Sequence, residues 1–94
     1  MTKIRRVVRI EAKPGVAEQM REALLALQQA TAAEAGCDEF GFFQALDRAH
    51  SFLLIEDFAD QAALDLHMQT PHTQAFFARD LVAGIAPIER AWMS

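Results

Sequence analysis

Two neighbouring segments, residues 38–46 and 51–59, constrain the fold most, because both carry apolar side chains on both faces. Each has the length and aromatic content of a strand, and the short polar turn between them predicts a β-hairpin. In the first strand Phe40 and Phe42 point one way and Phe43 points the other. A sheet covered by helices on one side would leave its second apolar face in water. We therefore expect another surface to cover that face.

The N-terminal third of the chain changes its apolar period once. Residues 3–12 alternate between apolar and polar positions, which predicts a half-buried strand. From residue 16 to residue 31 the apolar positions recur every three or four residues, which predicts an amphipathic helix. Gly36 lies just past the end of that helix, where glycine commonly stops one.

The C-terminal part predicts two short helices and a strand. Asp60 can cap the first helix, and Thr70 followed by Pro71 is typical of the start of the second. We expect the second helix to end at Gly84. A last strand should follow over residues 85–93, with its proline at a strand edge or start.

The order strand, helix, two strands, two helices and strand (βαββααβ) predicts an α+β fold. It matches the ferredoxin-like plan, a four-stranded antiparallel sheet with helices packed on one face. The 94 residues are expected to form a single domain, residues 1–94. Such a short chain buries only roughly 60–65% of its unfolded surface, yet 52% of its residues are hydrophobic. A second copy is therefore expected to cover the open sheet face, giving a homodimeric α/β barrel.

Charge, hydropathy and cysteine content argue against several classes of protein. The formal net charge is −4, and acidic residues precede the aromatic run at 40–43, so we expect no nucleic-acid partner. The longest apolar run, residues 52–55, is too short to cross a bilayer, and the basic N-terminus lacks the apolar segment of a secretory signal. We therefore expect a soluble protein with no membrane partner. Cys37 is the single cysteine, which excludes an intramolecular disulfide and is compatible with a cytoplasmic location.

Two of the three histidines flank the bend between the two short helices, which makes this bend the first candidate for a site. Imidazole titrates near neutral pH, so either ring could transfer protons if it faced a cavity. His67 is our choice for a catalytic base, because it shares a helix face with Leu64; a packed structural histidine is the alternative. His72 is interpreted as structural or as a ligand to substrate, and His50 as an exposed turn residue. Because His67 and His72 are five residues apart across Pro71, they form no same-face helical pair, and no metal site is expected.

Glu56 lies between apolar residues of a strand, where a carboxylate is costly unless it is paired. We expect Arg9 or Arg90 to pair with it across the sheet. The alternative is that Glu56 is a pocket acid with a raised pKa. Arg9 also belongs to the basic N-terminal strand, which could attract an anionic ligand.

Four short motifs occur in a fixed order: Lys13-Pro14-Gly15, Glu34-Ala35-Gly36-Cys37, Glu56-Asp57-Phe58 and His67-x-x-Thr70-Pro71-His72-x-x-x-Phe76. Together they resemble the antibiotic biosynthesis monooxygenase family, in particular its small quinol monooxygenase-like members, over about residues 3–93. The resemblance implies oxidation of a quinol-like or other electron-rich aromatic by O2 without flavin, haem or metal, so no cofactor is expected. The protein would supply a base, a dry pocket and orientation.

That activity implies a pocket with aromatic walls and a few polar groups. The candidate walls are Phe42, Phe76 and Trp92. The candidate polar groups, besides the base His67, are His72, Glu56 and Arg9.

The same fold is compatible with two other functions, an isomerase and a non-catalytic binding module, whereas the sequence argues against haem degradation. Haem degradation is not expected, because this chain has no Asn and carries Phe77 near the position where the haem-degrading relatives use a histidine. An isomerase of a small phosphorylated carbonyl compound remains possible on the same fold, with His67 or His72 moving protons. A non-catalytic dimeric module for small-molecule binding or stress response is the third alternative.

Overall fold

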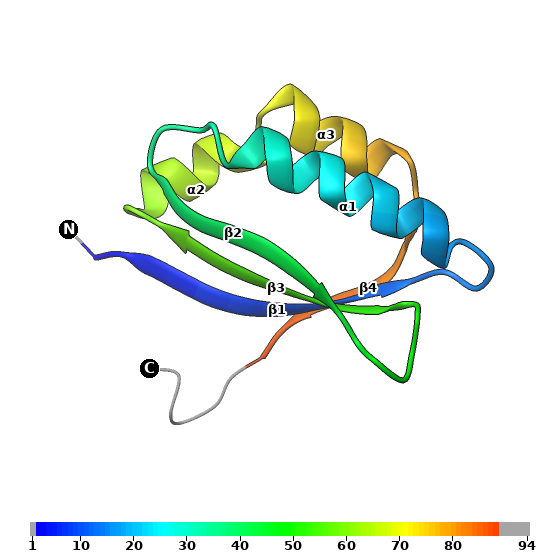
Figure 1. The fold of residues 1–94 in the computed structure, drawn as a ribbon. Coiled ribbons are helices and arrows are strands. Elements are labelled where there is room, and N and C mark those ends of the chain that lie inside the picture. The colour runs from blue at the N-terminus through cyan, green and yellow to red at the C-terminus, as the bar shows by residue number, and fades with distance from the viewer. Residues whose placement is uncertain (1, 89–94) are drawn as a thin grey trace.

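The computed structural model of the chain describes residues 2–88 and has four strands and three helices there. In chain order these are β1 (Ile4–Ala12), α1 (Ala17–Thr31), β2 (Cys37–Gln44), β3 (Ser51–Phe58), α2 (Gln61–Met68), α3 (Pro71–Ala78) and β4 (Val82–Pro87). The strands form one antiparallel sheet in the order β2-β3-β1-β4. All three helices lie on one face of that sheet (Figure 1). This is the expected α+β ferredoxin-like fold.

The end of α3 and the start of β4 differ from the sequence prediction. α3 ends at Ala78 and not at Gly84, because the backbone turns at Asp80, which has a φ of 56°. The turn lets Leu81 accept a hydrogen bond from the amide of Lys13, and β4 then begins at Val82 beside β1. Gly84 thus lies within β4. The predicted continuation of this strand beyond residue 88 lies outside the described residues.

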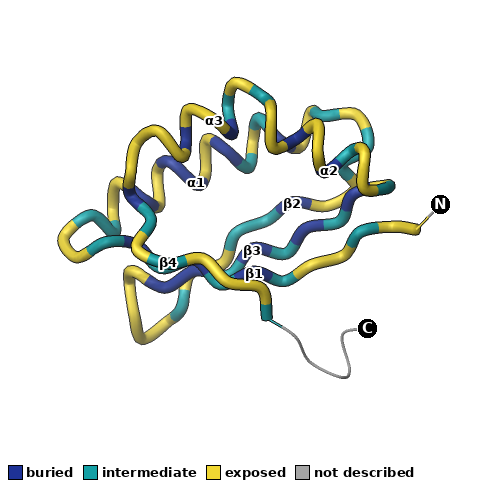
Figure 2. The backbone as a smooth tube through the Cα atoms, turned by 180° about the vertical axis from the view of Figure 1, so that it is seen from behind, coloured by how far each residue is buried: buried dark blue, intermediate teal, exposed yellow. Residues whose placement is uncertain are grey.

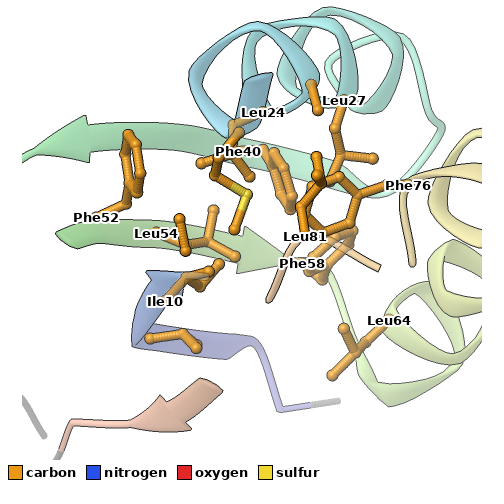
Figure 3. Packing of buried hydrophobic residues seen from close by; sticks show 14 residues of the cluster. Ile10, Leu24, Leu27, Phe40, Phe52, Leu54, Phe58, Leu64, Phe76 and Leu81 are labelled. Atoms are coloured by element: carbon orange, nitrogen blue, oxygen red, sulfur yellow. The ribbon is translucent and has the colours of Figure 1, made fainter. Parts of the chain in front are cut away.

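The core fills the space between the helices and the inner face of the sheet. On β3, Phe52, Leu54 and Phe58 are buried on the helix side of the sheet, where Phe58 packs against His67 of α2. From α1, the buried apolar residues are Met20, Ala23, Leu24 and Leu27. Figure 3 shows side chains of strands and helices meeting in this layer, and Figure 2 shows buried positions on both sides of it. The hydrophobic effect therefore holds the helix layer against the sheet.

The opposite face of the sheet carries no helix among residues 2–88. Its centre is apolar: Leu53 and Ile55 of β3 and Val7 of β1 are half-buried, and Phe43 of β2 is 54% exposed. The register places Phe43 beside Leu53 and Val7 beside Ile55. Both faces of the β2–β3 hairpin are thus apolar, as the sequence predicts. No helix of the described chain is long and apolar enough to span a membrane.

Replacing Gly36 with alanine is expected to destabilise the chain more than replacing Gly15. Both glycines have a positive φ, 85° and 82°, so each alanine costs about 1–2 kcal/mol in the left-handed region. A Cβ on Gly36 would also lie 2.8 Å from the Cβ of Ala63 in α2, whereas a Cβ on Gly15 would meet nothing within 4 Å. Urea unfolding of both variants measures the difference. Equal losses of unfolding free energy would show that α2 moves away without cost.

Candidate functional site

His67 lies in the last turn of α2 with its imidazole turned into the core. Asp60 caps the start of this helix by accepting a hydrogen bond from the amide of Ala63 at 2.9 Å. Leu64 and His67 form the buried face of the helix, and only 4% of the His67 side chain is exposed. The ring packs against Phe40 and Phe58, with centroid distances of 5.1 Å to each. His67 therefore faces inward, into an aromatic environment.

The bend between α2 and α3 brings His72 to the same side as His67. The hydroxyl of Thr70 donates to the carbonyl of His67 at 2.8 Å and accepts from the amide of Thr73, so it links the two helix ends. Pro71 occupies the first turn of α3, where its missing N–H costs no hydrogen bond. The two imidazole centroids are 6.3 Å apart. The bend between α2 and α3 therefore brings the two rings together, although their spacing in the sequence does not place them on one face of a single helix.

Glu34 joins the two imidazoles. Its Oε2 lies 2.9 Å from Nδ1 of His67 and 2.5 Å from Nε2 of His72. It belongs to the connection between α1 and β2, where its amide donates to the carbonyl of Thr31 and its own carbonyl accepts from the amide of Cys37. We call Glu34, His67 and His72 the carboxylate–imidazole cluster. The cluster lies at the end of the sheet where β2 begins and β3 ends.

The exposure of the cluster decreases from His72 to His67. The exposed side-chain fractions are 28% for His72, 14% for Glu34 and 4% for His67. A carboxylate that accepts the Nδ1 hydrogen of His67 fixes the tautomer of the ring and leaves Nε2 free to accept a proton. The three side chains also offer one ligand atom each within 4.8 Å of one another, an arrangement that could hold a metal ion.

Glu56 is paired as expected, but its partner is Arg6 and not Arg9. Nε and Nη2 of Arg6 lie 2.7 and 2.6 Å from Oε2 of Glu56, whose side chain is only 2% exposed. The register explains the choice, because Arg6 lies directly opposite Glu56 and points to the helix side of the sheet. Arg9 lies opposite Leu53 and points to the other face, away from His67. Arg90, the second expected partner, lies outside the described residues.

A pocket of about 190 Å³ opens at the other end of the helix–sheet layer. It is lined by Arg21, Leu24, Leu25, Gln28, Phe42, Gln44 and Phe52. Of the predicted substrate-binding residues in the described chain, only Phe42 contributes to it, since Phe76 is a buried core residue of α3. Trp92 lies outside the described residues. Phe40 does not line the pocket, but it lies between Phe42 and the cluster: its ring centroid is 5.3 Å from that of Phe42 and 5.1 Å from that of His67.

Sequence reasoning did not select Glu34, Arg6 or Phe40 as site residues. Glu34 was available as part of the motif at residues 34–37, and its position just after a helix end gave no hint of two imidazole partners. Arg6 lies on the apolar side of a strand, where an arginine signals a buried acid. Phe40 has the same pattern as its aromatic neighbours and carries no separate signal.

Cys37 lies next to the cluster but is not suited to nucleophilic chemistry at neutral pH. Burial raises the pKa of its thiol, and the negative charges of Glu34 and Asp38 raise it further. The thiol therefore stays protonated at pH values where a free cysteine begins to ionise. Because the thiolate is the reactive form, covalent catalysis through Cys37 is disfavoured.

Residues 3–79 match the antibiotic biosynthesis monooxygenase family. The chain is 29% identical over 80 residues to the Bacillus subtilis protein named "Putative monooxygenase YcnE", covering 85% of this chain and 84% of that protein. The crystal structure of PA3566 from Pseudomonas aeruginosa superposes with a TM-score of 0.84 at 33% identity, covering 96% of this chain and 95% of that one. Rv0793 from Mycobacterium tuberculosis shares the fold, with a TM-score of 0.80 at 22% identity over 95% of each chain. With the motifs, the βαββααβ order and these matches in agreement, the chain belongs to the antibiotic biosynthesis monooxygenase family.

Proposed function

We propose that this protein is a cofactor-independent monooxygenase that oxidises a quinol-like or other electron-rich aromatic with O2. Family membership supports a monooxygenase-like role. The observation that carries the finer proposal is the imidazole of His67, which is buried among phenylalanine rings and oriented by Glu34. A base held in an apolar environment suits deprotonation of a phenolic hydroxyl.

The reaction needs no electron carrier other than its substrate. Deprotonation of a hydroquinone by Nε2 of His67 produces an anion that is a stronger reductant and can pass an electron to O2. Recombination of the two radicals forms a C–O bond and, with the proton returned by His67, a ring hydroperoxide. Loss of the C–H proton at that carbon then breaks the O–O bond, which leaves one oxygen atom on the ring and releases the other as water. One hydroquinone and one O2 thus give one hydroxyquinone and one H2O. The protein contributes the base, the orientation of the ring and the exclusion of water.

We propose that the aromatic substrate enters through the pocket lined by Phe42 and reaches His67 when the Phe42 and Phe40 rings move aside. The pocket of about 190 Å³ is flanked by the phenyl rings of Phe42 and Phe52, which suit a planar aromatic. Arg21, Gln28 and Gln44 supply polar groups at the same pocket. Phe42 lines the pocket, and Phe40 contacts both Phe42 and His67, so these two phenyl rings lead from the pocket to the imidazole.

Oxygen consumption with a panel of hydroquinones tests the proposal. We expect O2 uptake that depends on the protein. Mass spectrometry after reaction with labelled O2 should detect a product that carries one oxygen atom from O2. Absence of uptake with every dihydroxyaromatic would refute the oxidation. In that case, protein-dependent exchange of protons between a phosphorylated carbonyl compound and solvent would favour an isomerase. Absence of activity in both assays would favour a binding module.

We also propose that the protein is a homodimer joined through the open sheet face. The apolar centre of that face, with Phe43 54% exposed beside Leu53, supports this arrangement. Replacing Phe43 with glutamate is expected to shift the chain from dimer to monomer in analytical ultracentrifugation, because the carboxylate would be buried against a second apolar sheet. A matched control is Phe77→Glu, which changes a residue 43% exposed on α3. A wild-type chain that sediments as a monomer would refute the proposal.

A further inference from the structure

We propose that the carboxylate–imidazole cluster binds a divalent transition-metal ion, with Zn²⁺ as the best match. This goes beyond the proposed oxidation and describes a different state of the cluster, because a metal ion on Nδ1 of His67 leaves the imidazole proton on Nε2, the atom that the oxidation uses as its base. Nδ1 of His67, Nε2 of His72 and a carboxylate oxygen of Glu34 converge from three different segments onto one point. Two imidazoles and one carboxylate are a donor set typical of zinc sites that keep a further position open.

The cluster has to rearrange locally to accept an ion. Ligand atoms around one zinc ion lie about 3–3.5 Å apart, since each lies about 2.0–2.2 Å from the metal. Here Oε2 of Glu34 lies 2.9 and 2.5 Å from the two nitrogens, and the three ligand atoms lie within 4.8 Å of one another. To hold an ion, the carboxylate has to withdraw by less than an ångström and the imidazole of His72 has to turn toward that of His67. His72 is 28% exposed and can adjust, whereas His67 is fixed between Phe40 and Phe58. One ligand is thus held rigidly and two can close on the ion.

The charges and the entry route are also compatible with a cation. Two neutral imidazoles and one carboxylate give the site a charge of −1, which a divalent ion more than compensates. His72 is the most exposed member, so the ion can arrive from solvent on that side. Imidazole ligands favour zinc and similar transition metals over Mg²⁺ and Ca²⁺, which prefer oxygen ligands.

Isothermal titration calorimetry of the chelator-treated full chain with Zn²⁺ tests this inference. We expect one saturable site per chain and no comparable binding of Mg²⁺. Glu34→Gln and His72→Gln should each weaken Zn²⁺ binding by at least about 100-fold, since loss of a direct ligand should cost no less than loss of an outer partner. His50→Gln, which changes an exposed histidine of the hairpin turn, is the matched control and should bind like wild type.

Substitution of Co²⁺ adds a spectroscopic readout that a structural role of these residues would not produce. Visible absorption of bound Co²⁺ should appear in wild type and His50→Gln and be lost in His72→Gln. If Glu34→Gln does not fold, His72→Gln decides the outcome, because that side chain is partly exposed. Absence of a saturable zinc site, or zinc binding that survives both substitutions, would overturn the inference. Neither readout depends on quinol turnover, so failure of the proposed oxidation would leave this result standing.

Discussion

Replacing His67 with glutamine should lower protein-dependent quinol oxidation by at least about 100-fold, which is the usual contribution of a positioned general base. Glutamine keeps a polar side chain of similar reach but cannot accept the phenolic proton. The measurement is the initial rate of O2 uptake at saturating hydroquinone. The expected loss is in kcat, since the proton is transferred after the substrate has bound.

Three further variants make this result specific. Glu34→Gln should reduce kcat less than His67→Gln does, by about 10-fold, because the imidazole remains but loses the partner that orients it. His50→Gln should leave kcat unchanged, since His50 lies in the exposed turn between β2 and β3. His67→Ala is a poorer test, because the ring fills space between Phe40 and Phe58 and its removal would leave a cavity. Unaltered turnover in a folded His67→Gln protein would assign His67 a structural role.

The fold could be predicted because local patterns and global topology agree along most of this chain. The alternation in β1, the three-to-four spacing in α1 and the Thr70-Pro71 start of α3 each specify an element from a few residues. The end of α3 could not be predicted in this way. Glycine is a residue type that commonly ends helices, so Gly84 was the expected end. The chain turns earlier, at Asp80, and β4 then pairs with β1.

The candidate site was predictable only in part, since its members come from distant segments. The inward direction of His67 follows from the period of α2, which also buries Leu64. The contact of Glu34 with both imidazoles depends on how the α1–β2 connection packs against the α2–α3 bend, and no local period encodes that. Strand register decided the partner of Glu56, because a shift by an odd number of residues changes the face on which an arginine lies.

Replacing Arg6 with methionine is expected to lower the free energy of unfolding by about 2–3 kcal/mol. The substitution leaves the carboxylate of Glu56, only 2% exposed, without its charged partner. Loss of one partner of a buried ion pair typically costs about 3–5 kcal/mol, and the 43% exposure of the Arg6 side chain reduces that value. Urea unfolding at neutral pH gives the free energy, and a surface pair on the same strand supplies a control. Arg5→Met removes the partner of Asp57. Because the Arg5 side chain is 68% exposed, this substitution should lower the free energy of unfolding by less than about 1 kcal/mol.

The double variant Arg6→Met, Glu56→Met should recover most of the stability that Arg6→Met loses. Two apolar side chains of similar volume remove the desolvated charge together with its partner, and such replacements are often neutral or stabilising. The double-mutant cycle should therefore give a coupling of about 2 kcal/mol between the two positions. An additive cycle, or an Arg6→Met variant no less stable than Arg5→Met, would show that Glu56 does not depend on Arg6. In that case the alternative interpretation of Glu56 from the sequence, an acid that lines a pocket, would become the better one.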